Sequence, residues 1–319
     1  MRGTFVLVAL LGLSTTLARA DDDAPIVGFQ AEPASGRLRI TVNGEPMATY
    51  VYRDAEIGRP HFLDVRAPGG LRITRTHPPG PGDPSDHPTM HPGLWLAFGD
   101  LSGSDFWRNK GVVEHERFEE APQGGAGLGS FAVANRYVSA DGKTLVAREV
   151  ARFTVHVQKN RYLISWRSEF QPGDGPLTFG DQEEMGLGVR LATPLAPKQG
   201  QGGRIVNAEG KVGEKEVRGQ ISAWCAGRGV IDGQPVSVTI LTDPDNVRPS
   251  WWHARDYGLI VANPFGRAAL TGEEPSRVTV NPGERFSLGF GVSIERAEPG
   301  ATIDPAAGFR EYLRTLGRD

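Results

Sequence analysis

Hydrophobic and polar residues alternate along several stretches of this chain, as they do in half-buried β-strands. Residues 37–42, 151–157, 161–170 and 285–294 each carry apolar side chains at every second position. Because successive side chains of a strand point to opposite faces, each stretch would bury one face and expose the other. This pattern predicts antiparallel strands in two sheets that pack face to face.

Turn residues separate these stretches in a way that supports the same prediction. Three dipeptides that favour tight hairpin turns lie between predicted strands: Asn43-Gly44, Asp141-Gly142 and Asp232-Gly233. A type I′ turn needs positive φ at both central positions, which these residue types tolerate. Glycine and proline together make roughly a fifth of the chain, without a collagen-like period. The predicted fold class is therefore all-β, a large antiparallel β-sandwich.

One helix is predicted, over Pro305 to Leu316, where Phe309, Leu313 and Leu316 share one side. The proline-rich segment 77–92 (HPPGPGDPSDHPTMHP) separates stretches that predict the same kind of sheet. We therefore interpret it as a long loop within a single β-sandwich domain over residues 21–319. Long loops of this kind are often functional.

Residues 1–20 have the features of a secretory signal peptide. Arg2 precedes a short apolar run over residues 5–13, and Ala18-Arg19-Ala20 supplies small residues for cleavage. The run is shorter than the roughly 20 residues that span a bilayer. We expect an exported protein, periplasmic or secreted, with no membrane span in its mature part.

Charge and composition exclude some classes of function. The net charge is -3, which gives no electrostatic reason to expect a nucleic-acid partner. Cys225 is the sole cysteine, so no disulfide framework is expected. The sequence holds no Walker loop, dinucleotide fingerprint or Gly-x-Ser-x-Gly elbow in a suitable context. No cofactor is required by the sequence, although a divalent metal stays open.

Residues 87–107 (HPTMHPGLWLAFGDLSGSDFW) contain the densest chemistry of the chain. His87 and His91 have the spacing of a helical metal pair, but Pro88 and Pro92 follow them and disfavour a helix. A loop can still bring both imidazoles to one point. They would then bind a metal or contact a substrate. The alternative is a structural loop whose histidines bond to the backbone.

The same segment offers aromatic surfaces. Alternation places Trp95 on the face opposite Leu94 and Leu96, where its indole could stack against a sugar ring. Asp100 would then accept hydrogen bonds from sugar hydroxyl groups. The alternative is a core strand rich in aromatic residues, with Asp100 as a turn residue beside Gly99.

Adjacent glutamates enter the predicted strand that follows residue 184. In an extended chain Glu183 and Glu184 point to opposite faces, so only one could face a cleft. We favour Glu184 as a general base, with Glu183 as a substrate contact. The alternative is a solvated turn.

Residues 249–258 (PSWWHARDYG) form a second polar and aromatic segment. We expect His253 to be catalytic and Trp252 to be a stacking surface. Arg255 could hold a carboxylate or keto oxygen, because its donors have a fixed geometry, and Asp256 would contact the substrate. The alternative is a surface Arg–Asp pair beside a core tryptophan.

Four segments together resemble a known bacterial family: HPTMHPGLWLAFGDLSGSDFW, FGDQEEMGLGVRLATP, ISAWCAGRGVIDGQPVSVTIL and PSWWHARDYGLIVANPFG. Members of this family of unknown function are often called methane oxygenase PmoA or PmoA-like. The resemblance covers nearly all of the predicted mature chain. It implies a β-supersandwich similar to galactose mutarotases and polysaccharide lyases, and hence carbohydrate as a substrate class. It implies no site residues.

The oxygenase name conflicts with the sequence. The methane monooxygenase subunit of that name is an integral membrane protein with several spanning helices, and this sequence predicts none after residue 20. We therefore interpret the name as a misnomer.

The leading hypothesis is an exported carbohydrate-active protein that uses acid/base chemistry, epimerase- or lyase-like, in polysaccharide breakdown. The predicted catalytic residues are His87, His91, Glu184 and His253. The predicted substrate contacts are Trp95, Asp100, Glu183, Trp252, Arg255 and Asp256. Two alternatives stay open: a non-catalytic carbohydrate-binding module, and a metal-dependent enzyme that uses the pair His87 and His91.

Overall fold

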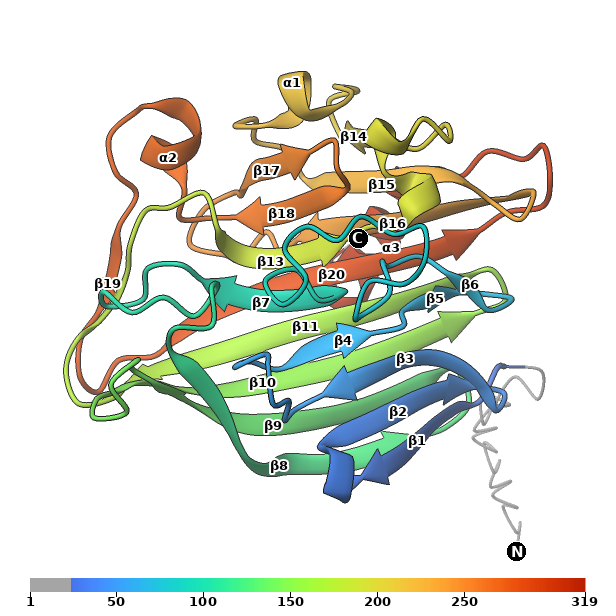
Figure 1. Cartoon of the computed structure of the whole chain (residues 1–319). Coiled ribbons are helices and arrows are strands. Elements are labelled where there is room, and N and C mark those ends of the chain that lie inside the picture. The colour runs from blue at the N-terminus through green and yellow to red at the C-terminus, as the bar shows by residue number, and fades with distance from the viewer. Residues whose placement is uncertain (1–23, 319) are drawn as a thin grey trace, which may run out of the picture.

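The protein, for which we obtained a computed structural model, consists mainly of two eight-stranded antiparallel sheets (Figure 1). The structure describes residues 24–318, so the predicted signal peptide at residues 1–20 lies outside the described part. The first sheet contains, in spatial order, β1 (Val27–Glu32), β2 (Arg37–Val42), β3 (Glu45–Val51), β4 (His61–Leu63), β7 (Leu94–Phe98), β13 (Met185–Arg190), β18 (Leu259–Asn263) and β17 (Trp251–Arg255).

The second sheet carries the longer strands. It contains β14 (Arg204–Asn207), β15 (Trp224–Ile231), β16 (Gln234–Thr242), β20 (Phe286–Arg296), β11 (Arg161–Pro172), β10 (Leu145–Gln158), β9 (Leu128–Val138) and β8 (Val112–Gly124). Two small ribbons pair β5 (Arg66–Ala67) with β6 (Leu71–Arg72), and β12 (Leu177–Phe179) with β19 (Val278–Val280). The predicted antiparallel β-sandwich is confirmed.

Short helices complete the described chain. They are η1 (Pro33–Ser35), η2 (Thr193–Leu195), η3 (Pro197–Gln199), α1 (Glu214–Val217), α2 (Arg267–Thr271) and α3 (Pro305–Thr315). The predicted C-terminal helix is α3, and the side chain of Asp304 caps its first turn. It packs on the outer face of the second sheet through Tyr312, beside Leu163 and Leu241. No helix within residues 24–318 is long and apolar enough to cross a bilayer.

Two of the three predicted glycine turns have the expected backbone. Both residues of Asn43-Gly44 and of Asp232-Gly233 have positive φ, as a type I′ turn requires. In Asp141-Gly142 only the glycine does, and the hairpin between β9 and β10 has a longer loop. All three hairpins form as predicted.

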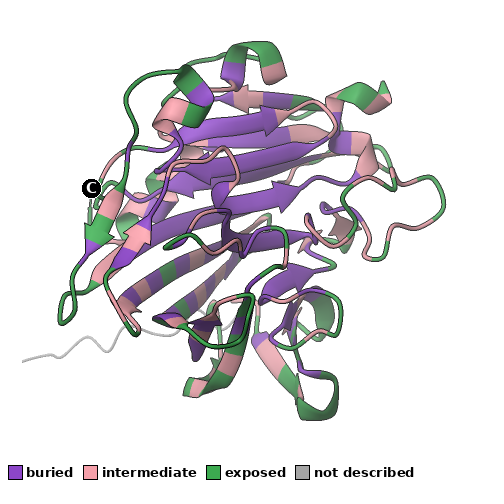
Figure 2. Ribbon diagram, turned by 60° about the vertical axis from the view of Figure 1, so that its left-hand side comes forward, coloured by how far each residue is buried: buried purple, intermediate pink, exposed green. Residues whose placement is uncertain are grey.

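The core lies between the sheets and includes residues from nearly every strand. Figure 2 shows several strands that are almost wholly buried, others in which buried and exposed residues alternate, and many exposed turns and loops. In β7, Leu94, Leu96 and Phe98 face this core, whereas Trp95 and Ala97 face the opposite way. The alternation predicted for this strand is therefore confirmed.

The outer face of the first sheet is also partly covered. Trp95 and Ala97 form a second, smaller cluster there with Trp107, Leu259 and Val261. The loop between β6 and β7, which has no helix or strand between residues 75 and 93, contributes Met90 to this cluster. This covered outer face contains most of the predicted site residues.

Candidate functional site

An aromatic stack lies on the outer face of the first sheet. The imidazole of His91 lies nearly parallel to the indole of Trp95, with ring centroids 5.3 Å apart. His87 stacks on His91 at 4.9 Å, and Tyr257 lies 5.8 Å from His87. Trp107 meets Trp95 edge-on at 5.3 Å. The loop therefore brings the two histidines together, as the sequence predicts for a non-helical segment.

Glycine at position 188 makes room for this stack. Gly188 of β13 is paired with Trp95 of β7. A Cβ atom at position 188 would lie only 2.8 Å from Cζ2 of the indole. The bare backbone thus lets Trp95 lie flat across the neighbouring strand.

Several buried nitrogen atoms of this stack have no hydrogen-bond partner within the described chain. They are both ring nitrogens of His91, Nε1 of Trp95 and of Trp107, and Nε and Nη1 of Arg190. His91 is only 2% exposed. Buried polar groups are normally paired, because an unpaired one costs about 1–3 kcal/mol. A cluster of this kind is typical of a site that offers its donors to a ligand.

Buried arginines surround the stack. The guanidinium of Arg190 lies 4.5 Å from the ring centroid of Tyr257 and donates to Asp86 at 2.8 Å. Arg75 donates to backbone carbonyls of the loop, including that of Asp86 at 2.6 Å. Arg59 donates to the carbonyl of Trp107 at 2.8 Å. These contacts hold the loop on the sheet and leave a surplus of positive charge beneath it.

A second group of polar side chains lies beside Tyr257, at the edge of the same face. Glu183 Oε2 accepts from Arg218 Nη2 at 2.6 Å and from Arg255 Nη2 at 3.2 Å. Nδ1 of His253 lies 3.6 Å from the same oxygen. Nε of Arg255 lies 3.4 Å from Nε2 of His253, and its Nη1 pairs with Glu214 at 2.7 Å. Carboxylate, imidazole and guanidinium groups thus form one network.

The strand register fixes how these two groups are placed. Trp95, Gly188, Val261 and His253 lie opposite one another on four neighbouring strands of the first sheet. Three strand spacings separate Trp95 from His253, about 14 Å between backbones. Tyr257 follows the end of β17. It stacks on His87, and the charges of Arg255 and Glu183 act on the pKa of its hydroxyl group. Tyr257 therefore lies between the two groups.

Burial and charge shift the pKa values of the central groups. Burial lowers the pKa of His253 to about 4, although Glu183 opposes this shift. Burial and the charge of His87 lower the pKa of His91 to about 2. Both imidazoles are therefore neutral at pH 7. Burial raises the pKa of Tyr257 to about 12. Although burial acts to raise it, the pKa of Glu183 is lowered overall by the hydrogen bond from Arg218 and by the charges of Arg255 and Arg218.

Six predicted site residues lie in these two groups. They are His87, His91 and Trp95 in the stack, and Glu183, His253 and Arg255 in the network. Glu183, predicted as a substrate contact, lies beside His253, whereas Glu184 was predicted as the general base.

Two predicted residues need correction. Trp252 is 0% exposed in the core between the sheets, where its Nε1 donates to Ser222, so it offers no stacking surface. Its position follows from strand parity, since neighbouring residues face opposite ways. Glu184 pairs with Arg108, whereas the carboxylate near His253 is that of Glu183, so Glu184 is not placed as a base for this site.

Asp100 and Asp256 have local structural contacts. Asp100 accepts from the backbone of Gly103 at 2.9 Å, as a turn residue does. Asp256 accepts from the backbone of Glu214 at 2.8 Å, at the start of α1. Neither contact places the carboxylate within the stack.

Several contributors were not among the predicted site residues, including Tyr257, Arg190, Arg75 and Arg218. Tyr257 belongs to the polar segment 249–258 and could have been found there. Arg190 ends an otherwise apolar strand, which was a usable signal. Arg75 and Arg218 come from distant segments that carry no motif.

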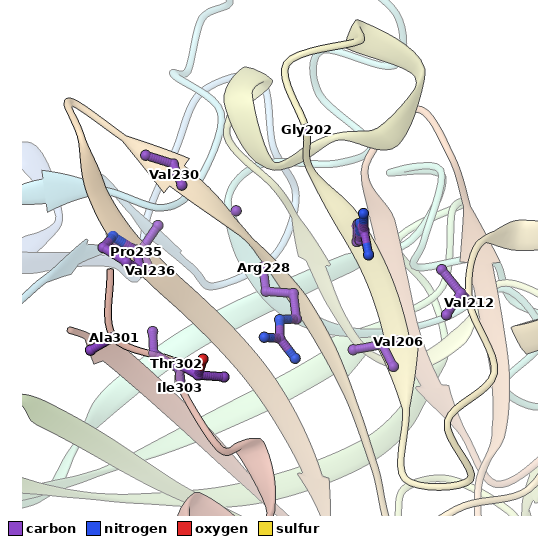
Figure 3. Close-up of a pocket in the computed structure, with 12 residues that line it drawn as sticks. Gly202, Val206, Val212, Arg228, Val230, Pro235, Val236, Ala301, Thr302 and Ile303 are labelled. Carbon is purple, nitrogen blue, oxygen red and sulfur yellow. The ribbon is translucent and has the colours of Figure 1, made fainter. Parts of the chain in front are cut away.

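Two further observations bear on the site. Within residues 24–318 no group of three or more His, Cys, Asp or Glu side chains is arranged to hold a metal ion. A groove of about 540 Å³ on the outer face of the second sheet (Figure 3) is lined by Val206, Arg228, Ile303 and others. None of the predicted site residues is among the twelve that line it.

Comparison with known families identifies a family for most of the chain. The model of a family described as "Family of unknown function (DUF6807)" matches residues 37–302. No curated protein matches the sequence.

Solved structures show similarity at low scores. The GH36 alpha-galactosidases AgaB and AgaA from Geobacillus stearothermophilus share 14% identity over 86% and 79% of this chain, each with a TM-score of 0.41. The chain spans about two fifths of their length, 41% and 40%. Slr1438 from Synechocystis sp. PCC 6803 shares 13% identity, over 90% of this chain and 99% of its own, with a TM-score of 0.32. At such scores the similarity says nothing of activity or substrate.

Proposed function

This chain belongs to the family of unknown function DUF6807, and we propose that its outer-face site binds a sugar or sugar derivative and acts on it by acid/base chemistry. One observation carries the proposal. Unpartnered buried donors and stacked aromatic rings lie beside an imidazole–carboxylate pair on one face of one sheet. A sugar offers both an apolar ring face and hydroxyl acceptors, which such a site would satisfy.

Binding would begin at the exposed edge of the stack. The side chain of His87 is 42% exposed, and Tyr257 is partly exposed. The loop over residues 77–92 covers His91 and Trp95, so it moves aside when a ring enters. The two indole nitrogens and one ring nitrogen of the neutral His91 then donate to the sugar, and the other ring nitrogen of His91 accepts. Arg190 and Arg255 donate to a carboxylate or keto oxygen.

His253 is the proposed proton acceptor. Its Nε2 accepts from Nε of Arg255, which assigns the ring proton to Nδ1, 3.6 Å from Glu183, and makes Nε2 the atom that would accept a proton. The ionised Glu183 would stabilise the imidazolium that forms. On binding, the substrate would displace Arg255 from its long contact with Nε2 of His253. Removal of a proton from a sugar carbon is the first step of both epimerisation and β-elimination, which are the reaction types we propose.

Export through residues 1–20 and a role in polysaccharide breakdown belong to the same proposal.

One observation favours a non-catalytic binding protein instead. His253 is only 2% exposed, and Arg255 occupies its Nε2. A substrate that cannot displace Arg255 would be bound but not converted.

The adjacent glutamates provide a matched test. Neutral, acidic and keto sugars and their oligosaccharides would be screened for binding by calorimetry and for turnover by NMR. We expect E183Q and H253Q to slow turnover of a substrate found in this way by about 10²-fold or more. E184Q, one residue away, should stay within about twofold of the wild-type rate. Equal rates for E183Q and E184Q would refute the acid/base assignment. Binding without turnover would support the non-catalytic alternative.

A further inference from the structure

A pocket of about 430 Å³ lies at the end of β17, beside α2. Its lining includes Trp251, Ile221, Ser276 and three arginines, Arg248, Arg267 and Arg277. Figure 1 places α2 next to the ends of β17 and β18. The pocket contains none of the predicted site residues.

The three arginines give this pocket a strong positive charge. None of them has a carboxylate within 4.0 Å in the described chain. Arg248 donates to the carbonyl of Ser276 at 2.7 Å, and Arg267 donates to those of Glu274 and Pro275 at 2.5 and 3.2 Å. Arg277 makes no side-chain hydrogen bond within residues 24–318 and is exposed.

The nearest acid does not neutralise them. Burial and the charge of Arg267 lower the pKa of Arg248, and the charge of Asp181 opposes this shift. The carboxylate of Asp181, however, accepts hydrogen bonds from the backbone of Ala268, Ala269 and Ser276. It also accepts from the hydroxyl group of Ser276 at 2.9 Å. This carboxylate thus holds α2 in place, and the pocket keeps three guanidinium groups without a carboxylate partner. Arginine donors in this number suit an anion.

The pocket continues the proposed sugar site along one strand. Trp252 and Ala254 face the core between the sheets, so Trp251, His253 and Arg255 face outward together. Alternate residues of a strand lie about 7 Å apart. Trp251 is therefore one side chain away from His253 on the same face. A ligand longer than one ring could reach both.

We propose that this pocket is a subsite for an acidic saccharide, in which the arginines bind a carboxylate or sulfate group and Trp251 packs against the ring. The saccharide identity rests on the proposed function. The excess of positive charge stands independently of it. The substrate class is thereby narrowed from sugars in general to oligosaccharides that carry negative charge.

The test uses a hexamer of galacturonic acid as the probe, with its methyl ester as a neutral match, in calorimetric titrations of the full chain. Arg277→Glu is the principal variant, because Arg277 has no structural contact to lose. Arg228→Glu, in the groove of Figure 3, makes the same charge change on the opposite outer face. Inorganic sulfate alone tests for simple anion binding.

We expect the acidic hexamer to bind more tightly than its ester, and Arg277→Glu to weaken it about three- to tenfold at low salt. Arg228→Glu should leave its affinity unchanged. Equal weakening by both variants, or equal affinity for hexamer and ester, would overturn the subsite, as would displacement of the hexamer by stoichiometric sulfate. Loss of binding in Tyr257→Ala but not in Arg277→Glu would refute the subsite alone. Loss of binding in Arg277→Glu but not in Tyr257→Ala would refute the proposed sugar site and support the subsite.

Discussion

Two buried polar clusters of this protein differ in how completely their hydrogen bonds are satisfied. Between the sheets, Glu149 is 4% exposed, and its carboxylate accepts from Asn135 at 2.9 Å, Tyr137 at 3.2 Å and Ser168 at 2.5 Å. On the outer face, His91 is similarly buried, yet neither of its ring nitrogens has a partner.

The difference distinguishes a cluster that stabilises the fold from one that serves a ligand. Both oxygen atoms of Glu149 are engaged, so hydrogen bonds offset part of the cost of burying the group, although burial still raises the pKa of its carboxyl group. The donors around His91 recover little, and the fold retains them at a cost in stability. Sites of function are expected to be poorly satisfied in this way.

The largest expected effect comes from breaking the hydrogen-bonded cluster around Glu149. Glu149→Ala leaves the side chains of Asn135, Tyr137 and Ser168 without their shared acceptor in the core. We expect the free energy of unfolding to fall by about 3 kcal/mol or more, measured by chemical denaturation. A loss below about 1 kcal/mol would show that this network contributes little to the fold.

The unpartnered His91 should make the stability of the fold depend on pH. The pKa of His91 is about 2 in the folded chain, against about 6.5 when unfolded. Between these values only the unfolded chain binds the proton, so stability is complete above about pH 6.5 and falls as the pH decreases. The expected slope is about 1.4 kcal/mol per pH unit for this histidine. Between pH 7 and pH 5 the free energy of unfolding should fall less with decreasing pH in His91→Phe than in wild type. An unchanged slope would contradict the buried neutral imidazole.

At pH 7 the same substitution should be nearly neutral for the fold. Phenylalanine can keep the stack on Trp95 and removes two unpartnered nitrogens. We expect the free energy of unfolding to stay within about 1 kcal/mol of wild type, or to rise. A loss comparable to that in Glu149→Ala would mean that His91 is a structural residue.

The smallest effect is expected at Glu184. Its largely buried carboxylate pairs with the more exposed Arg108, and no ion pair joins it to His253 within residues 24–318. Glu184→Gln should change the free energy of unfolding by about 1 kcal/mol at most. A larger loss in thermal or chemical unfolding would indicate a role that this pair does not explain.

Local sequence signals predicted most of the fold. Period-two alternation and glycine turns depend on neighbouring residues, so β2, β3, β10, β11 and β20 could be located in advance. The stack of His87 and His91 was also accessible, because both residues lie in one short loop beside Trp95.

The rest depended on how distant strands pair. Which of Trp251 and Trp252 faces the core is set by the register of β17 against β18. In the same way, the start of β13 decides that Glu183, and not Glu184, approaches His253. The alternation is visible in the sequence, but no local signal shows which of two neighbouring residues faces the core. Arg218 reaches Glu183 from a segment 35 residues away.

The central claim is that the unpartnered donors around His91 serve a sugar ligand. Calorimetric titration of the sugar panel into wild type and His91→Phe, both folded at pH 7, tests it most directly. We expect at least one neutral, acidic or keto sugar to bind wild type and to lose about tenfold or more in affinity in the variant, with little change in stability. Equal affinity in both proteins, or no binding by any member of the panel, would contradict the claim.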